Sequence, residues 1–470
     1  MKTLIKNGTL ITASDTFKAD ILIEGETIAQ IGVDLEPDSV KVVDAAGKLI
    51  LPGGIDPHVH LDLPMFGTVS SDDHYTGHKA AAFGGTTTVM DFVVQEKQGF
   101  KHSVDVWMEM AQKAAIDYSF HMNLTHFDDQ IAKEIPSLAE MGITTLKVFT
   151  AYNGRLRLDD GGIFKALRVA KDNGMLVMAH CENGDVIDTL IPEALAAGRT
   201  TPEWHALTRP GWGAVEATLR MAAMSETANA PVYIVHMNMA GEVDMLKYAR
   251  ERGVPVMGET CPPYLFFSVD DLRRPDGAKW ICSPPMRSKA DNARIWEGLS
   301  EGVLQTIGTD HCPFFFDGTR PIVYEGQEVA IPGKELGKDD FTKIPNGLPG
   351  IQDRMPVLWT HGVRTGRITP NQFVAYMSTN PAKIFGLYPR KGALVPGADA
   401  DLVIWDPEKQ VKYGVALSHQ RTDYNLYEGW DLVGYPEKVF LRGGMIVDGD
   451  QWLGKRGGGQ FLKRGQGEVI

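Results

Sequence analysis

The chain has 470 residues, of which 43% are hydrophobic, so it can bury a large core and exceeds the usual size of one domain. Its net charge of −13 argues against nucleic acid or an anionic membrane surface as a partner. The four cysteines lack CxxC spacing, no run of about 18 apolar residues occurs and no signal-peptide pattern is present, which together predict a cytoplasmic protein without a disulfide framework.

Short alternating strands are predicted at both ends of the chain. Near the start, LIKNGTLITASD and DILIEGETIAQIG contain Asn-Gly and Glu-Gly turns, and near the end ADLVIWDP and VFLRGGMIVDGDQW repeat this pattern. We therefore expect residues 1–50 and 385–450 to form one composite β-sandwich domain. Residues 451–470 are predicted to be a C-terminal tail that is too polar to form its own core and packs on a neighbouring subunit.

Between these ends, residues 51–384 alternate apolar runs of strand length with helical patterns, which is typical of parallel βαβ units. The eight predicted strands are LILPGGIDPHVH, TTTVMDF, DYSFHMNLTHF, ITTLKVFT, MLVMAHC, PVYIVHM, GVPVMGET and VLQTIGTD. Eight such units predict an α/β fold, a TIM (β/α)8 barrel, whose chemistry lies at the C-terminal ends of its strands.

Polar side chains end several of these predicted barrel strands. His58 and His60 end the first strand, and because residues i and i+2 share a face, both imidazoles can converge on one ion. Two hydrogen-bonded histidines without an ion are the alternative. His180, His236 and Asp310 occupy the same position on other strands, and imidazole with carboxylate is the ligand set that zinc-like ions select, so the pattern favours a metal site.

Lys147 ends the fourth predicted strand and admits two interpretations. It can pair with a carboxylate such as Asp310. Alternatively, a desolvated, neutral lysine can react with carbon dioxide to give a carbamate whose two oxygens bridge two metals. Asp310 can be a structural carboxylate, a ligand, or a ligand that also moves a proton from water to a leaving nitrogen.

The chain resembles a known enzyme family over essentially its whole length. HVHLDLPMFGTVSSDD, AAAFGGTTTVMDF, LKVFTAY, AHCENGD, CSPPMR, GTDHCPF, KIPNGLPGIQDR and NPAKIFGLYPRKGALVPGADADLVIWDP are similar to the motifs of the hydantoinase and dihydropyrimidinase family of the amidohydrolase superfamily. The resemblance implies a barrel hydrolase that opens cyclic diamides, 5-substituted hydantoins or dihydropyrimidines, to N-carbamoyl amino acids at a binuclear metal centre. It also implies a homotetramer.

The family pattern implies a role for each matching residue. Two divalent ions, expected to be zinc, would be held by His58, His60, carboxylated Lys147 (N6-carboxylysine) and Asp310, and by Lys147, His180 and His236. Tyr152 would bond the carbonyl oxygen under attack, while the main chain at Ser283 and Asn346 would grip the ring amide. Leu63, Phe149 and Leu156 would contact the hydantoin substituent, although each of these six can instead be a packing or turn residue.

Other functions remain open at this point. Allantoinase and dihydroorotase are related cyclic-amide hydrolases, but the carboxylate of dihydroorotate would require an arginine, and the rim segments offer only Arg155 and Arg157. A non-catalytic scaffold is the alternative from another class. Relatives of that kind have lost metal ligands, whereas all six are present here.

Overall fold

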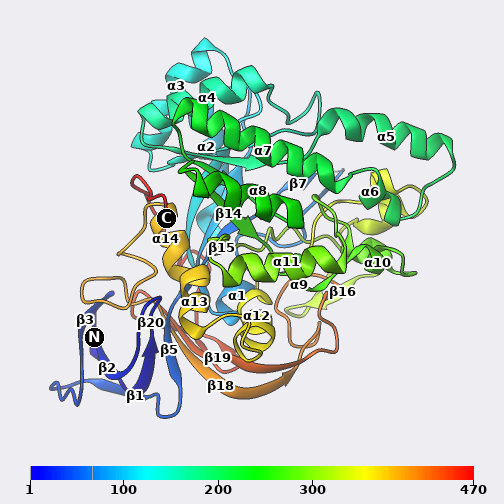
Figure 1. Cartoon of the computed structure of the whole chain (residues 1–470). Helices are drawn as coiled ribbons and strands as arrows, with labels where there is room; N and C mark the ends of the chain where they lie inside the picture. Colours follow the sequence, from blue (N-terminus) through cyan, green and yellow to red (C-terminus); the bar gives the residue numbers. More distant parts are fainter. Residues whose placement is uncertain (1, 66) are drawn as a thin grey trace.

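The structure is a computed structural model that describes residues 2–65 and 67–470. It contains an eight-stranded parallel sheet surrounded by helices and a separate nine-stranded sheet, which Figure 1 shows in blue and orange below the helical part. The expected fold class, an α/β barrel with a smaller β domain, is confirmed. Among the described residues, no helix is both long and apolar enough to cross a membrane.

The barrel strands follow one another in chain order, and each pairs with the next in parallel. They are β6 (Gly54–Val59), β9 (Thr86–Val93), β10 (Asp117–Asn123), β11 (Thr145–Phe149), β12 (Leu176–His180), β13 (Val232–Ile234), β14 (Val256–Thr260) and β15 (Thr306–Ile307). The chain after β15 closes the ring, because the N–H of His60 donates to the carbonyl of His311 at 2.8 Å. All residues of β6, β9, β10, β12 and β14 are buried, as strands covered on both faces must be.

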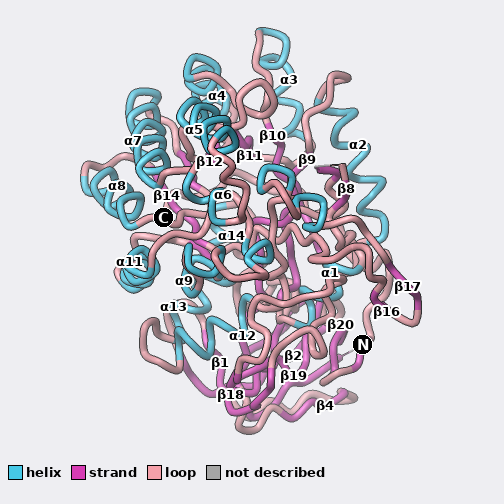
Figure 2. The backbone as a smooth tube through the Cα atoms, turned by 90° about the vertical axis from the view of Figure 1, so that its right-hand side faces the viewer, coloured by secondary structure: helices cyan, strands magenta, loops and turns pink. Residues whose placement is uncertain are grey.

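The longer helices lie outside the barrel and cover its strands, as Figures 1 and 2 show from two directions. Several begin at a side-chain cap: Asp128 accepts from the backbone of Gln130 and Ile131, and Asp159 accepts from that of Gly162. The helices are α1 (Thr76–Phe83), α2 (Phe100–Met110), α3 (Asp129–Glu140), α4 (Asp160–Asp172), α5 (Gly184–Ala196), α6 (Glu203–Leu207), α7 (Gly211–Ala228), α8 (Ala240–Glu251), α9 (Pro263–Phe266), α10 (Val269–Leu272), α11 (Lys289–Ser300), α12 (Arg354–Leu358), α13 (Pro370–Val374) and α14 (Asn380–Ile384).

The nine-stranded sheet joins strands from both ends of the chain. It consists of β1 (Lys2–Ile11), β2 (Thr16–Glu24), β3 (Thr27–Gly32), β4 (Lys41–Asp44), β5 (Leu49–Pro52), β18 (Leu402–Lys412), β19 (Asp431–Leu441), β20 (Gly444–Asp448) and β21 (Gln451–Trp452). The link between the ends is the antiparallel pair of β5 with β18, in which Leu51 lies opposite Val403. Two short hairpins, β7 (Pro64–Met65) with β8 (Thr68–Val69) and β16 (Ile322–Tyr324) with β17 (Gln327–Val329), lie outside both sheets.

The segment LILPGGIDPHVH, expected to be one barrel strand, is two strands in different sheets. Its first four residues form β5 and the part from Gly54 onward forms β6. Gly53 lies between them and packs closely against the barrel, since a Cβ there would come within 2.1 Å of Thr87 Oγ1. A glycine is therefore needed where the chain passes from one sheet to the other.

The C-terminal tail packs on the barrel of its own chain, and its expected contact with a neighbouring subunit stays a prediction. The N–H of Leu462 donates to the carbonyl of Tyr118 at 2.7 Å, and Leu462 is fully buried. Arg464, 4% exposed, donates to Ser119 Oγ at 2.9 Å and to Thr145 Oγ1 at 2.8 Å. The tail is polar because its bonds go to backbone and hydroxyl groups at the N-terminal ends of the barrel strands.

A buried ionic cluster joins the nine-stranded sheet, the barrel and the tail. Lys391 Nζ lies 2.7 Å from Asp117 Oδ2, at the start of β10, and 2.7 Å from Asp401 Oδ2, just before β18. Asp117 also accepts hydrogen bonds from the Arg442 side chain and from the backbone N–H of Gln460. Removing one member would leave the other charges buried without compensation, so the cluster fixes how these three parts meet.

Candidate active site

The first three candidate ligands meet at the C-terminal rim of the barrel. His58 is near the end of β6 and His60 follows it, while Asp310 follows β15. Asp310 Oδ1 lies 3.1 Å from the Nε2 atom of each of these histidines. One atom from each residue can thus be chosen so that all three lie within 4.8 Å of one another, a spacing that suits a common ion.

The remaining candidate ligands lie on neighbouring strands at the same rim. The rings of His180 and His236 have centroids 4.7 Å apart, and His180 Nδ1 lies 3.0 Å from His236 Nε2. The ring of His236 is 5.5 Å from that of His58, which connects the two groups of histidines. The side chain of Lys147 ends among aromatic rings, and its Nζ atom lies 4.8 Å from the centroid of the Phe92 ring.

These donors fit divalent cations. His58 Nε2 is buried without a hydrogen-bond partner and faces the Asp310 carboxylate. Lys147 is 2% exposed, and Asp310 pairs with the two histidines and not with its amine. Unpaired buried imidazole nitrogens beside a carboxylate are what a metal ion would satisfy, and a buried amine without a carboxylate partner suits a neutral or modified lysine.

The electrostatics of the rim follow from its burial. Burial lowers the pKa of Lys147 to about 8, so its neutral form is accessible near neutral pH. Burial also acts to lower the pKa of His58, but Glu259 and Asp310 outweigh it and raise this pKa to about 9. Conversely, His58 and His60 overcome the burial of Asp310 and hold the pKa of its carboxyl well below the usual range.

Two carboxylates that sequence reasoning missed orient the candidate ligands. His58 Nδ1 donates to Glu259 Oε1 at 2.7 Å, and His180 Nε2 donates to Glu182 Oε2 at 2.8 Å. Metal-ligating histidines usually hold a carboxylate or carbonyl in this way, because the bond fixes the tautomer and the ring orientation. Glu259 lies at the end of β14 and was detectable as another polar residue at a strand end.

The backbone is unusual at three of the candidate residues. Tyr152, His236 and Asp310 have φ angles of 68°, 40° and 52°. This left-handed region is disfavoured for side chains other than glycine, asparagine and aspartate, and such conformations cluster at active sites. Tyr152 is therefore held in a conformation that local preference would not select, whereas histidine and aspartate adopt it more readily.

The candidate substrate-binding residues form two groups near the histidines. The ring of Tyr152 lies 5.2 Å from that of His180, and burial raises the pKa of its phenol above the usual range, so the hydroxyl stays protonated and able to donate. Asn346 Nδ2 donates to Ser283 Oγ at 3.1 Å, and Ser283 is also close enough to the Tyr152 phenol to act on its pKa. The structure thus brings the two predicted ring-gripping loops into contact.

The three candidate pocket residues are placed differently from one another. The Phe149 ring lies 5.7 Å from that of His180, and the N–H of half-buried Leu156 donates to the carbonyl of Tyr152 at 3.0 Å. Leu63, by contrast, is 6% exposed and belongs to the main hydrophobic core. Phe149 thus lies beside a candidate ligand and Leu156 follows Tyr152 closely, and the contact of all three residues with a substituent stays a prediction.

The loop after β6 is anchored by a chain of charged groups. Lys113 Nζ lies 2.8 Å from Asp62 Oδ1, His74 Nδ1 donates to Asp62 Oδ2 at 2.7 Å, and His74 Nε2 lies 3.1 Å from Asp91 Oδ2.

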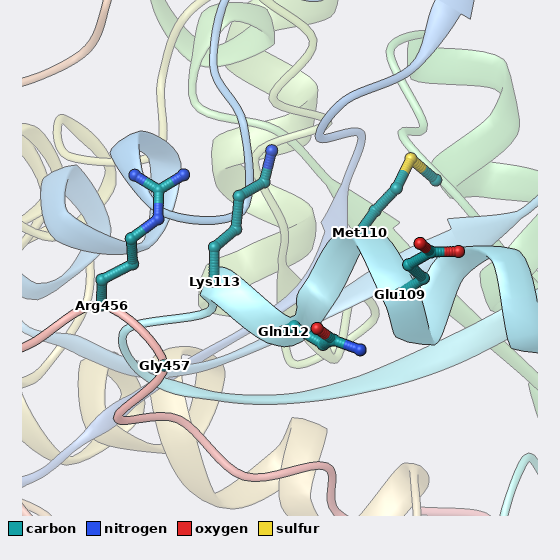
Figure 3. A pocket seen from close by; sticks show the side chains of 6 residues that line it. All are labelled: Glu109, Met110, Gln112, Lys113, Arg456 and Gly457. Carbon is teal, nitrogen blue, oxygen red and sulfur yellow. The ribbon is translucent and has the colours of Figure 1, made fainter.

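On the surface, the side chains of Lys113 and Arg456 lie side by side at a cavity of about 440 Å³ (Figure 3). The cavity is also lined by Glu109, Met110, Gln112 and Gly457. None of the six residues that line this cavity belongs to the ligand cluster.

Comparison with known proteins accounts for this arrangement. Residues 49–446 match the amidohydrolase family. The chain belongs to the amidohydrolase family. It is 46% identical to a D-hydantoinase of Geobacillus stearothermophilus, covering 99% of this chain and 97% of that protein, and 41% identical to a D-hydantoinase of Streptomyces coelicolor, covering 98% of each. The crystal structure of a dihydropyrimidinase from Brevibacillus agri superposes with a TM-score of 0.95 at 46% identity, covering 100% of both chains.

The family resemblance drawn from the motifs is thereby confirmed. For an amidohydrolase, the cluster of His58, His60 and Asp310 indicates that a divalent metal ion binds at the barrel rim.

Proposed function

We propose that this amidohydrolase opens the rings of 5-substituted hydantoins and dihydropyrimidines by hydrolysis, giving N-carbamoyl amino acids. One observation carries the proposal: the rim cluster of His58, His60 and Asp310 lies on a chain that matches D-hydantoinases over 99% of its length. Because the two D-hydantoinases are 46% and 41% identical to this chain, we further propose a preference for the D enantiomer.

The proposed metal site uses all six predicted ligands. His58, His60 and Asp310 would hold one divalent ion, His180 and His236 a second, and carboxylated Lys147 would bridge them; we propose zinc because its ligands are imidazole and carboxylate. When bound, two such ions would polarise the amide carbonyl and lower the pKa of a water molecule. The buried, unpaired amine of Lys147 supports carboxylation, because only a neutral amine attacks carbon dioxide.

The chain's own residues would then orient the ring and move the proton. The Tyr152 hydroxyl, protonated near neutral pH, would donate to the oxygen of the carbonyl under attack. Asp310 would accept the proton of the attacking water at its carboxylate and return it to the ring nitrogen as the C–N bond breaks. The main chains at Ser283 and Asn346 would grip the ring amide, and Leu63, Phe149 and Leu156 would contact the substituent.

The two rim arginines argue against dihydroorotate as the substrate. Arg157 is already paired, with NH1 2.7 Å from both Asn153 Oδ1 and Asp185 Oδ1, and Arg155 is exposed. Arg157 is therefore already committed to other groups, and Arg155 is exposed, whereas the predicted ligands are buried or partly buried. The weaker alternative within the family is allantoinase.

We also propose a cytoplasmic location and a homotetramer. The location is supported by the four cysteines, which are all buried and unpaired, as expected in a reducing compartment. Assembly is supported by large apolar side chains exposed on the outer helices, above all Trp212, which is 76% exposed at the start of α7. Light scattering would give the oligomeric mass.

The test is turnover of hydantoins bearing methyl and phenyl groups, dihydrouracil, allantoin and dihydroorotate side by side by purified, metal-analysed protein. We expect the hydantoins and dihydrouracil to be opened and dihydroorotate to be untouched. In Asp310→Asn, which keeps the shape but loses the base, kcat should fall by several orders of magnitude. Turnover confined to allantoin or dihydroorotate would overturn the proposal, and so would a fully metal-loaded but inactive enzyme.

A further inference from the structure

A lysine outside the ligand cluster is buried without any acidic partner. Lys334 opens the short helix η3 (Lys334–Gly337) and is 1% exposed. Its Nζ donates to two backbone carbonyls, that of Ile281 at 3.0 Å and that of Pro345 at 3.1 Å. None of the ion pairs found among residues 2–65 and 67–470 includes it, so its contacts are with the main chain and not with a counter-charge.

The two carbonyls belong to the two segments that carry the proposed ring-gripping residues. Ile281 precedes Ser283 by two residues, and Pro345 directly precedes Asn346. These segments also touch each other, because the N–H of Gly347 donates to the same Ile281 carbonyl at 3.1 Å. Lys334 therefore joins two backbone segments that are more than 60 residues apart in the sequence. Ser283 and Asn346, which belong to these segments, are 63 positions apart.

The hydrogen bond of Lys334 to the Pro345 carbonyl is not duplicated by the backbone. Within the described part of the chain, no backbone N–H donates to the Pro345 carbonyl, so Lys334 is the donor that satisfies it. Burial lowers the pKa of Lys334 to about 7, and a neutral amine offers two N–H donors, matching the two carbonyls. An amine is costly to bury, and an apolar side chain would fill the same space, which indicates that the two bonds themselves are required.

We propose that Lys334 is a positioning residue that sets the distance between the Ser283 and Asn346 main chains, so that both can hold the ring amide at once. This inference rests on the proposed function, because it concerns the binding of a cyclic amide. Within the described part of the chain, the two hydrogen bonds of Lys334 Nζ go to backbone carbonyls and not to a predicted metal ligand. Its effect should therefore be the same for every ring, whatever group the ring carries.

The test compares Lys334→Met, which keeps length and loses the donors, with Lys343→Met, an exposed lysine in the same segment. For Lys334→Met we expect KM to rise about 10- to 100-fold by one common factor for methylhydantoin, phenylhydantoin and dihydrouracil, with metal content unchanged and kcat little affected. Lys343→Met should behave as the parent protein. An unchanged KM, or a rise that differs with the substituent, would overturn the proposal.

A second measurement does not depend on turnover. Hydrogen exchange at the Gly347 amide should accelerate in Lys334→Met and not in Lys343→Met, because the carbonyl pair that holds the segment is released. Should Lys334→Met not fold, Lys334→Gln keeps two N–H donors on a shorter arm and should show an intermediate KM. A parent protein inactive on all rings would reject the proposed function, while unaltered Gly347 exchange in the variant would reject the clamp alone.

Discussion

The Nδ1 atom of His58 and the Oε1 atom of Glu259 lie 2.7 Å apart in the barrel interior, with both side chains almost fully buried. Because the carboxylate can only accept this bond, Nδ1 of His58 carries a proton, and Nε2 is the nitrogen directed at Asp310 on the rim. The orientation of a candidate metal ligand is thus set by a residue on a strand that the sequence separates from it by 201 positions.

Glu259→Gln should weaken metal binding without removing any ligand. The amide cannot hold the tautomer of His58 as a carboxylate does, so we expect metal affinity to fall about 10- to 100-fold while the fold is retained. Competition with a chelator measures this. The matched control is Glu297→Gln on the exposed face of α11. Equal metal affinities in the two variants would show that Glu259 matters only for its hydrogen bonds to Tyr233 and to the backbone of His236.

Lys147→Ala should remove both metal ions together with the activity, because the proposed carbamate bridges them. A short carboxylic acid supplied with metal should restore part of the activity, since a free carboxylate can occupy the vacated space. Elemental analysis and turnover check both effects, and Lys165→Ala, an exposed lysine on α4, is the control. A full metal complement in the Lys147 variant would rule out the bridge.

Leu156→Ala should change the order in which hydantoins are preferred. Its backbone N–H is bonded to the carbonyl of Tyr152, the residue proposed to bond the carbonyl under attack, and its side chain is half-buried. Removing methylenes from an apolar pocket alters discrimination by about 1–3 kcal/mol, so the ratio of kcat/KM between phenyl- and methylhydantoin should shift roughly 10- to 200-fold. Leu219→Ala, exposed on α7, should leave the ratio alone. A uniform loss that includes dihydrouracil would mean that Leu156 only positions the loop.

Stability should depend on the protonation of His74. Burial acts to lower its pKa, but Asp62 and Asp91 outweigh burial and raise the pKa to about 9. A group with a raised folded pKa contributes stability that is complete below its unfolded pKa of about 6.5 and is lost as pH rises through the folded value. The free energy of unfolding should therefore fall by up to about 3 kcal/mol between pH 6.5 and 9 from this group, at about 1.4 kcal/mol per pKa unit.

Denaturant titrations across that pH range, with His74→Gln beside the parent protein, measure this contribution. The variant should be less stable at pH 6.5, and its stability should change less toward pH 9. His126→Gln, whose ring is 68% exposed, provides the comparison. Parallel pH profiles for parent and His74 variant would contradict the assignment.

A chain ending at Trp452 should lose stability, because the tail covers the N-terminal end of the barrel. Burying a residue such as Leu462 contributes about 1.5–3 kcal/mol, and the bonds of Arg464 are lost as well. Thermal unfolding should show a lowered Tm, whatever the oligomeric mass by light scattering. Arg456→Ala, an exposed tail residue, should have little effect. An unchanged Tm on truncation would show that the tail adds nothing to the fold.

The barrel could be predicted because its signals are local. Strand-length apolar runs alternate with helical patterns, and His58, His60 and Asp310 each follow a recognisable run. The prediction was wrong where two consecutive strands belong to different sheets. LILP and GIDPHV form one apolar segment in the sequence, and only the pairing of Leu51 with Val403 assigns LILP to the nine-stranded sheet.

Glu259 and Lys334 were missed for a different reason. Glu259 was visible as a polar residue at a strand end, but the partners of both residues lie far away in the sequence, and which strands or loops become neighbours is not written in any local pattern. Glu182 lies only two residues after His180, so its bond is local and was overlooked.

The packing of the tail on its own barrel was not foreseen, because polarity was taken as a sign of missing core contacts. In the fold its polar groups have hydroxyl and backbone partners, as the bonds of Arg464 to Ser119, Thr145 and the Phe120 carbonyl demonstrate.

The pairing of β5 with β18 has a consequence for how the protein is made. Pro52 and Leu402 are about 350 residues apart, so at about 5–20 residues per second the ribosome needs roughly 20 to 70 s to supply the partner of β5. During that time an apolar strand, LILP, has one open edge next to a nascent barrel. The newborn chain therefore passes through a period in which chaperone binding or strand exchange with another copy competes with completion of the nine-stranded sheet.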